Sequence, residues 1–286
     1  MTNFVAKTLL LAQNRLARLR AQQHPIFILQ MGRVGSASVL AAVKQAYKDL
    51  ALETPVYHSH YIANYDRIAE RASRDLQDPS GVARDIERVD KKNRDVLFSH
   101  LNRNETIKII SLVRDPVARN VSTFFYALPE FLPNWKEMEV CGALPSEELH
   151  VIFETKQSYI QTALNWFDEQ LRDGLNIDIY TLPFRKERGY QIYHYDKIQL
   201  LILRMEDLFR TGEHALRSFL GLRHLQIGKI NTGAEREAYE LYRRFLTRSL
   251  SRRYLEPTYS SQLARHFYTE NEIEQFMFQW SNPGAV

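Results

Sequence analysis

The chain has little cysteine and no long apolar run. Its 286 residues contain one cysteine, Cys141, which cannot form an intramolecular disulfide, so no oxidising compartment is indicated. No apolar run approaches the ~20 residues that a membrane-spanning helix needs. The segment 1–24 has neither a continuous apolar core nor a small-residue cleavage site, which argues against a signal peptide. These absences predict a soluble, cytoplasmic protein.

Acidic residues are missing from the first part of the chain. Residues 1–24 carry Lys7, Arg15, Arg18 and Arg20, with apolar residues between them at helical spacing. This pattern is typical of a basic amphipathic helix, which either packs on the protein or lies on the inner face of an anionic membrane. The net charge of +4 suits anionic ligands but is too small to indicate nucleic-acid binding.

No Gly/Ser-rich or Pro-rich linker divides the rest of the chain, and no internal repeat or low-complexity tract interrupts it. With 44% hydrophobic and 25% charged residues, the composition is that of a globular protein. We therefore expect residues 25–286 to form one domain that is large enough to bury a core.

Short apolar runs alternate with amphipathic stretches along this domain. The expected strands are 26–29, 56–60, 96–98, 107–113, 177–180 and 200–204. The expected helices are 36–50, 67–93, a helix opened by Asp115-Pro116, 158–171, 211–220 and 234–254. This alternation predicts an α/β fold with a parallel sheet covered on both faces, and ligands bind beyond the carboxyl ends of such strands.

The loop after the first expected strand reads Gln-Met-Gly-Arg-Val-Gly-Ser-Ala-Ser. Gly32 and Gly35 allow a tight turn that points N–H groups inward, and the start of the next helix adds unpaired donors. Ser36 and Ser38 could cap this helix or bind phosphate oxygens. ATP-binding loops end in Gly-Lys-Ser/Thr, whereas Arg33 stands before the second glycine here. The loop therefore indicates an anion site, with a ligand-free turn as the alternative.

A second candidate site follows the expected strand 107–113. Arg114 leaves the carboxyl end of this strand, Asp115 and Pro116 suit the start of a helix, and Ser122 lies two turns further on. An arginine fork and a hydroxyl that converge can clamp a phosphate monoester. The alternative is that Arg114 simply pairs with Asp115.

Together the two segments resemble the nucleotide site of sulfotransferases. A buried strand ending in Arg-Asp-Pro, with Ser122 eight residues after Arg114, is similar to their 3′-phosphate motif, and 33–38 is similar to their 5′-phosphosulfate loop. Segments 201–208 and 217–222 are similar to the strand–helix unit near the end of that domain. The resemblance implies a P-loop NTPase-like α/β fold, 3′-phosphoadenosine 5′-phosphosulfate as donor, adenosine 3′,5′-bisphosphate as product, and no metal.

The resemblance also implies which residues contact the nucleotide. These are Gly32, Arg33, Val34, Gly35, Ser36, Ala37, Ser38, Arg114 and Ser122, and a later glycine-flanked loop adds Lys229 and Asn231 as candidates. Arg33 stands where related 2-O-sulfotransferases usually carry lysine, and Ala37 where serine or threonine is common.

The implied acceptor is a carbohydrate. The sequence Val-Tyr-His-Ser-His-Tyr at 56–61 resembles the His-x-His segment of uronic acid 2-O-sulfotransferases, and the chain also resembles bacterial proteins assigned to capsular polysaccharide synthesis. His58 and His60 would share one face of a strand, and a neutral imidazole can take the proton of a hydroxyl. We favour His60 as the base, with His58 and His100 as alternatives, and expect Arg33 to stabilise charge on the leaving phosphate.

Two other functions remain open. A P-loop kinase would need Gly-Lys-Ser/Thr and an acidic residue for Mg²⁺. A non-catalytic glycan-binding or assembly protein would keep the fold without activity, although the presence of Arg33, Arg114 and Ser122 argues against it. The expected helix 234–254 would carry five arginines that suit an acidic glycan, an anionic membrane or only solvent.

Overall fold

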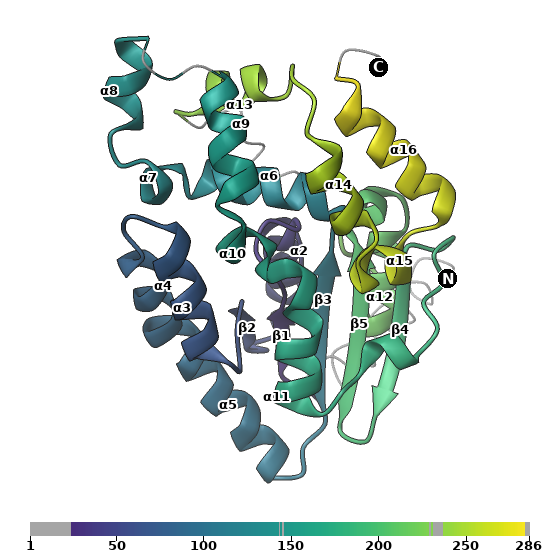
Figure 1. Ribbon diagram of the computed structural model, residues 1–286. Helices are drawn as coiled ribbons and strands as arrows, with labels where there is room; N and C mark the ends of the chain where they lie inside the picture. Colours follow the sequence, from purple (N-terminus) through teal and green to yellow (C-terminus); the bar gives the residue numbers. More distant parts are fainter. Residues whose placement is uncertain (1–23, 143, 145, 229, 231–236, 284–286) are drawn as a thin grey trace, which may run out of the picture.

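The computed structural model describes residues 24–142, 144, 146–228, 230 and 237–283 (Figure 1). The chain has an α/β fold built on a five-stranded sheet with the order β2-β1-β3-β5-β4. The strands are β1 (Ile26–Leu29), β2 (Val56–Ser59), β3 (Ile107–Val113), β4 (Tyr190–Tyr195) and β5 (Ile198–Arg204). Four of them run parallel, and β4 is antiparallel to β5. The predicted α/β class is confirmed, and the sheet is mostly rather than wholly parallel.

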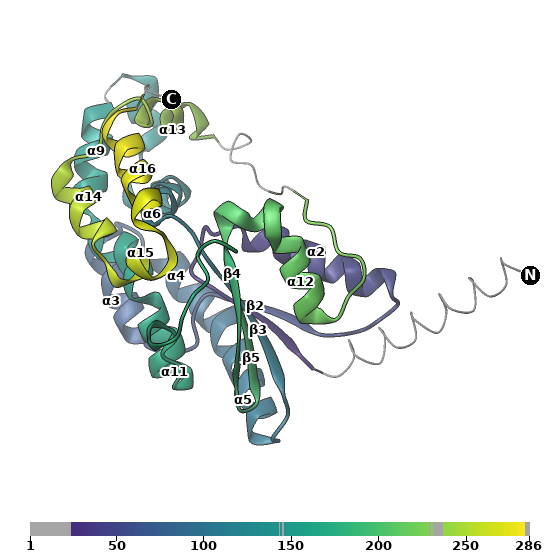
Figure 2. The same cartoon turned by 90° about the vertical axis from the view of Figure 1, so that its right-hand side faces the viewer.

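The central strands are continuous apolar runs because helices cover both faces of the sheet. All four residues of β1 are buried, as is almost every residue of β3 and β5. On one face lie α2 (Ser36–Asp49) and α12 (Glu213–Leu220), as Figure 2 shows. The opposite face is covered by segments that include α3 (Tyr65–Asp75), α11 (Asp173–Leu175) and α15 (Gln262–Phe267).

A second, aromatic core lies above the carboxyl ends of the strands (Figure 1). Phe124 is its centre, with ring contacts to Phe153 at 5.6 Å and Phe245 at 6.2 Å. Its helices are α6 (Pro116–Tyr126), α7 (Leu128–Phe131), α8 (Trp135–Val140), α9 (Ser146–Thr155), α13 (Tyr239–Phe245), α14 (Arg252–Tyr259) and α16 (Glu270–Ser281). Ile273 and Phe276 of α16 pack against both cores and so join them.

Nine further elements are described. They are the helices α4 (Ser80–Asp85), α5 (Lys91–Asn102) and α10 (Gln157–Ile160), the 3₁₀ turns Gln161–Asn165, Ile179–Thr181 and Met205–Asp207, and the π-helical turns Ile86–Asp90, Asp168–Arg172 and Leu208–Gly212. No helix among the described residues is long and apolar enough to span a bilayer. Residues 1–23, which hold the expected amphipathic helix, lie outside the described part of the chain.

Two of the expected strands are wrong. The run 96–98 lies in α5, where only Leu97 is fully buried, and an apolar triplet is too short to show its period. Residues 177–180 form a turn, because the Asp178 carboxylate accepts a bond from the Tyr180 N–H at 3.0 Å. The sequence analysis also missed β4, although Tyr190–Tyr195 is rich in tyrosine and isoleucine. This edge strand joins β5 through a two-residue turn with Asp196 in the left-handed region.

The expected helix 234–254 is also wrong. Within the described residues, α13 ends at Phe245, and α14 begins after Ser251, whose hydroxyl accepts a bond from the Tyr254 N–H. Three of the five arginines pair with carboxylates: Arg243 with Glu240, Arg244 with Glu139 and Arg248 with Glu147. The predicted single basic face therefore does not exist.

Candidate functional site

The loop between β1 and α2 has the tight backbone that its glycines predict. Arg33 and Gly35 both have positive φ, 73° and 81°, before α2 begins at Ser36. A Cβ on Gly35 would also meet the side chains of Leu208 and Met205 at 3.4 and 3.5 Å. The left-handed backbone favours glycine at this position, and glycine leaves the start of α2 without a side-chain cap. Uncapped N–H groups at a helix start suit an anion.

Neither serine of the loop caps α2. The Ser36 hydroxyl lies 3.1 Å from Nε2 of His58, and the Ser38 hydroxyl accepts a bond from the Ile230 N–H at 3.2 Å. Val34 is fully buried, so its side chain belongs to the core, and Ala37 has no polar side chain. Both can offer only main-chain groups to a ligand.

The structure brings the two predicted phosphate segments together. Strands β1 and β3 are parallel neighbours, so the segments that follow them meet at one edge of the sheet. Nε of Arg33 donates to Oγ of Ser122 at 3.2 Å, and Arg114 donates to the Arg33 carbonyl at 3.1 Å. The Arg33 guanidinium also lies over the ring of Tyr126, 4.7 Å from its centre. Two guanidinium groups and a hydroxyl thus converge at the loop.

Asp115 is occupied elsewhere and is not the partner of Arg114. Its carboxylate caps α6 by accepting from the N–H groups of Val117 and Ala118. It also accepts from Oη of Tyr259 at 2.8 Å and from Nε1 of Trp280 at 3.1 Å. Burial raises the pKa of Asp115, and these four donors oppose that rise.

Arg119 is a site residue that the sequence analysis missed. Its side chain is 5% exposed, donating from Nε to the Gly32 carbonyl at 3.1 Å and from Nη1 to the Ile160 carbonyl at 2.6 Å. No carboxylate among the described residues forms an ion pair with it, and burial lowers its pKa. A buried cation without a counter-ion is costly, so an anion bound at the loop would stabilise it. The sequence showed only that Arg119 lies four residues after the expected helix cap Asp115, which does not reveal its burial.

His58 and His60 lie side by side at the same edge, with ring centres 5.3 Å apart. The side-chain nitrogen of Gln30 is 3.2 Å from Nε2 of His58 and 3.0 Å from Nδ1 of His60. Nδ1 of His60 is also 3.1 Å from the Gln30 carbonyl, which can only accept. With a proton on Nδ1 of His60, this carbonyl accepts from His60, and the Gln30 amide donates to Nε2 of His58. Nε2 of His60 is then able to take a proton.

Both histidines are neutral at physiological pH. Burial, helped by His60 and Lys44, lowers the pKa of His58 to about 4, and burial also lowers the pKa of His60. A Cβ on Gly32 would lie 3.9 Å from Cε1 of His60, so this ring is next to the phosphate loop. The arrangement can therefore accept a proton close to a bound anion.

The backbone of His60 is fixed from two directions. Its N–H donates to Asp90 at 2.9 Å, and its carbonyl accepts from Nε1 of Trp166 at 2.8 Å. Burial raises the pKa of Asp90 to about 7. Trp166 is 1% exposed, so it supports the histidine from the core and offers no stacking surface to a sugar.

The structure does not bring His100 to this site. It lies on α5, where Nδ1 pairs with Glu105 at 2.5 Å, and its ring packs near Phe27 at the start of β1. His100 was an alternative base because it would follow the expected strand 96–98, and that segment belongs to α5 instead. Lys229 and Asn231 lie outside the described residues.

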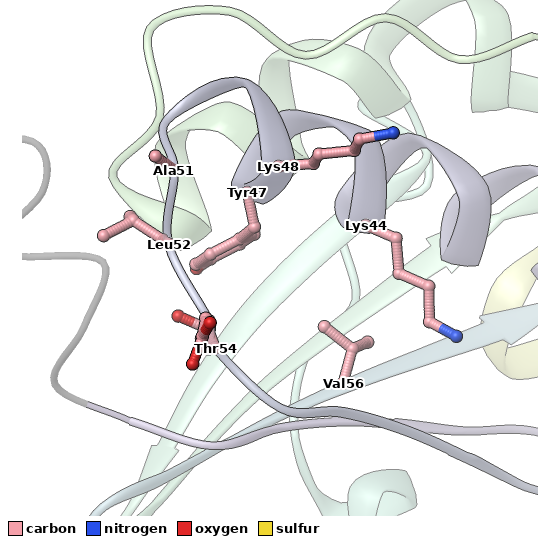
Figure 3. A pocket seen from close by; sticks show the side chains of 8 residues that line it. Lys44, Tyr47, Lys48, Ala51, Leu52, Thr54 and Val56 are labelled. Atoms are coloured by element: carbon pink, nitrogen blue, oxygen red, sulfur yellow. The ribbon is translucent and has the colours of Figure 1, made fainter.

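A cavity of about 350 Å³ lies at the other end of α2 (Figure 3). Lys44 and Lys48 line it beside Tyr47 and Thr54, but the two ammonium groups point to different places and both side chains are exposed. This cavity is not part of the phosphate site. Within the described residues, no cluster of three or more His, Cys, Asp or Glu side chains is placed to hold a metal ion.

A family model, NKWYS, with the description "Putative capsular polysaccharide synthesis protein", matches residues 145–268. Over this stretch the chain is similar to capsular polysaccharide synthesis proteins. Searches of curated proteins and of solved structures find no match. The matched stretch contains β4, β5 and three of the seven helices around the aromatic core, α9, α13 and α14. It does not include the loop after β1 or the residues Arg114 and Ser122.

Proposed function

We propose that this chain transfers a sulfuryl group from 3′-phosphoadenosine 5′-phosphosulfate to a hydroxyl of a carbohydrate, in the synthesis of a capsular or other surface polysaccharide. The observation that best supports the proposal is the convergence of Arg33, Arg114 and Ser122 at adjacent strand ends. A donor with phosphate groups at both ends of its ribose needs two such anion sites close together. The family match over residues 145–268 supports the carbohydrate half.

Each anion site has a chemical reason. The start of α2 and the buried guanidinium of Arg119 would hold the 5′-phosphosulfate, because both supply positive charge next to Gly32. Arg114 and Ser122 would hold the 3′-phosphate through a charge-assisted pair and a hydroxyl bond. Arg33 lies between the two groups, bonded to Ser122 by its side chain and to Arg114 by its carbonyl.

The reaction needs a base and a group that stabilises the leaving phosphate. Nε2 of His60 would take the proton of the acceptor hydroxyl while the oxygen–sulfur bond forms. The bond between sulfur and the bridging oxygen of the 5′-phosphate breaks, and adenosine 3′,5′-bisphosphate leaves with the negative charge. Arg33 and the loop N–H groups lie where this charge develops. Arginine stays protonated, so Arg33 acts electrostatically and not as an acid.

A kinase function is less well supported. The loop has no Gly-Lys-Ser/Thr ending. Asp115, the first acidic residue after β3, already accepts four bonds from its own surroundings. Little of this carboxylate remains for Mg²⁺. A non-catalytic glycan-binding protein would not need a base held next to two anion sites.

Thermal unfolding with added nucleotides tests the donor class. Adenosine 3′,5′-bisphosphate without metal should raise the unfolding temperature, and Mg-ATP should have a smaller effect. Arg114→Ala should lose most of the rise, whereas His100→Ala should keep it because His100 lies far from the loop. If Mg-ATP raised the unfolding temperature more than adenosine 3′,5′-bisphosphate, the kinase function would be favoured over sulfuryl transfer.

A further inference from the structure

A cavity of about 430 Å³ opens between the end of α9, α10 and the start of α14. Thr155, Gln157, Gln161 and Arg253 line it with polar groups, and Tyr254 and Pro257 add carbon surface. Its volume lies in the range of about 300–1,000 Å³ that is usual for ligand sites. No residue assigned above to the donor or to the base lines it.

This cavity and the phosphate loop lie on opposite sides of α6. Ser122 of α6 accepts from Arg33, whereas the side-chain amide of Asn120 lies 3.0 Å from the Tyr254 hydroxyl. Residues two apart on a helix differ by about 200° around its axis, so these two side chains leave opposite faces. Arg119 connects the two sides, because it bonds both Gly32 of the loop and Ile160, the residue before Gln161.

The polar groups of the cavity suit a sugar. Glutamine side chains offer both donors and acceptors to hydroxyl groups. The Gln157 side chain donates to the Phe153 carbonyl, and its oxygen is buried without a partner among the described residues. That oxygen is closed off from the cavity, so the Gln161 amide is the glutamine group that can meet ligand hydroxyls. The carbon surface of Tyr254 and Pro257 can pack against the C–H face of a sugar ring.

Glu154 and Arg253 are the two charged side chains that line the cavity, and Arg253 is the one that can bind an acidic sugar. Both oxygens of Glu154 are occupied by Ser251, which donates from its N–H at 2.8 Å and from its hydroxyl at 2.5 Å. Arg253 forms no ion pair with any described residue, so the structure gives its guanidinium no fixed counter-charge. A guanidinium in that state binds a carboxylate through two parallel hydrogen bonds.

All eight residues that line the cavity fall within 145–268, the stretch that matches the capsular polysaccharide family. We propose that the cavity binds a uronic acid residue of a glycan chain and so holds the acceptor polysaccharide on the protein. The inference rests on the carbohydrate half of the proposed function and not on the sulfuryl donor. Binding of a chain at a second place raises the effective concentration of its hydroxyls near the transfer site.

A glycan array that carries uronate-containing and neutral oligosaccharides tests the cavity without donor nucleotide. The wild-type chain should bind uronate-containing glycans in preference to neutral ones. Arg253→Gln and Gln161→Glu should each weaken that binding about tenfold or more, because a charge-assisted bond is lost in one and a repulsive carboxylate is added in the other. Arg252→Gln is the matched control, since Arg252 and Arg253 are both exposed and only Arg253 lines the cavity.

Two results would overturn the assignment. One is that the wild-type chain binds no uronate-containing glycan, and the other is that Arg253→Gln binds as well as Arg252→Gln. Binding of adenosine 3′,5′-bisphosphate is measured on the same variants and should be unchanged in all of them. If the chain binds the glycan but not the nucleotide, the glycan-binding role of the cavity stands and the sulfuryl donor is wrong. The two proposals can therefore fail separately.

Discussion

Nε of Arg33 donates to Oγ of Ser122 at 3.2 Å, although the two residues are 89 positions apart in the chain. This bond joins the loop after β1 to the helix after β3. Because Arg114 also donates to the Arg33 carbonyl, Arg33 is tied to both members of the second clamp. The two anion sites are therefore one structural unit.

Replacing Arg33 by alanine should reduce turnover far more than nucleotide affinity. The loop N–H groups, Arg114 and Arg119 still hold a ground-state anion, whereas Arg33 stabilises charge that develops only as the donor bond breaks. We expect a loss of about 100-fold or more in kcat, typical of removing one such donor, with a few-fold change in affinity for adenosine 3′,5′-bisphosphate. Equal losses in the two quantities would remove the catalytic role.

Replacing His60 by alanine should lower the rate of transfer to a carbohydrate acceptor by about 100-fold or more, as expected for a lost general base. Nucleotide binding should be little changed. His100→Ala is the control and should leave the rate unchanged, because His100 pairs with Glu105 at the other end of the sheet. The role of His60 fails if H60A and H100A turn over equally fast.

The pH dependence of stability should report the buried His58. Its pKa falls from 6.5 to about 4 on folding, so the folded chain binds fewer protons than the unfolded chain between these values. The stabilising contribution of neutral His58 is present above pH 6.5 and is lost as the pH falls toward 4.

Urea unfolding at pH 7 and pH 4.5 measures this contribution. The stability advantage of the wild type over His58→Gln should be larger at pH 7 than at pH 4.5. Asp90 acts in the opposite direction, because burial raises its pKa to about 7, but it is common to both chains and cancels in the difference. His194→Gln, at an exposed position, is the matched control for removing a histidine. If the H58Q difference were constant, His58 would not be buried as described.

Removing the Tyr259 hydroxyl should destabilise the chain. Asp115 is fully buried and accepts from Oη of Tyr259 at 2.8 Å, so Tyr259→Phe leaves a buried carboxylate with one donor fewer. The expected cost is about 1–3 kcal/mol in the free energy of unfolding. Tyr242→Phe is the control, since the Tyr242 hydroxyl forms no hydrogen bond with the described residues. A cost no larger than that of Y242F would mean that Tyr259 does not support Asp115.

The sequence predicted the parallel centre of the sheet because β1, β3 and β5 are apolar runs buried on both faces. Such runs can be recognised in the sequence alone. It also predicted the cap at Asp115, which depends on local chemistry. It missed β4, whose pairing is set by its neighbour β5, and it mistook part of α5 for a strand because three apolar residues do not define a period.

The sequence predicted those residues of the candidate site that lie at or soon after the carboxyl ends of strands. Arg33, Arg114 and Ser122 could be chosen from spacing, and the pair His58 and His60 from strand geometry. Arg119 could not be chosen in this way, because its role comes from hydrogen bonds to the carbonyls of Gly32 and Ile160, which are far apart in the sequence. Gln30 and Asp90 were missed for the same reason, since their contacts to His60 exist only in the folded chain.

The central claim is that Arg114 and Ser122 recognise a 3′-phosphate, and isothermal titration with two nucleotides tests it most directly. Adenosine 3′,5′-bisphosphate should bind the wild-type chain at least tenfold more tightly than adenosine 5′-monophosphate, which lacks the 3′-phosphate. In Arg114→Ala this preference should largely disappear while the affinity for the monophosphate stays the same. Equal affinities of the wild-type chain for both nucleotides, or a preference that survives in R114A, would contradict the account.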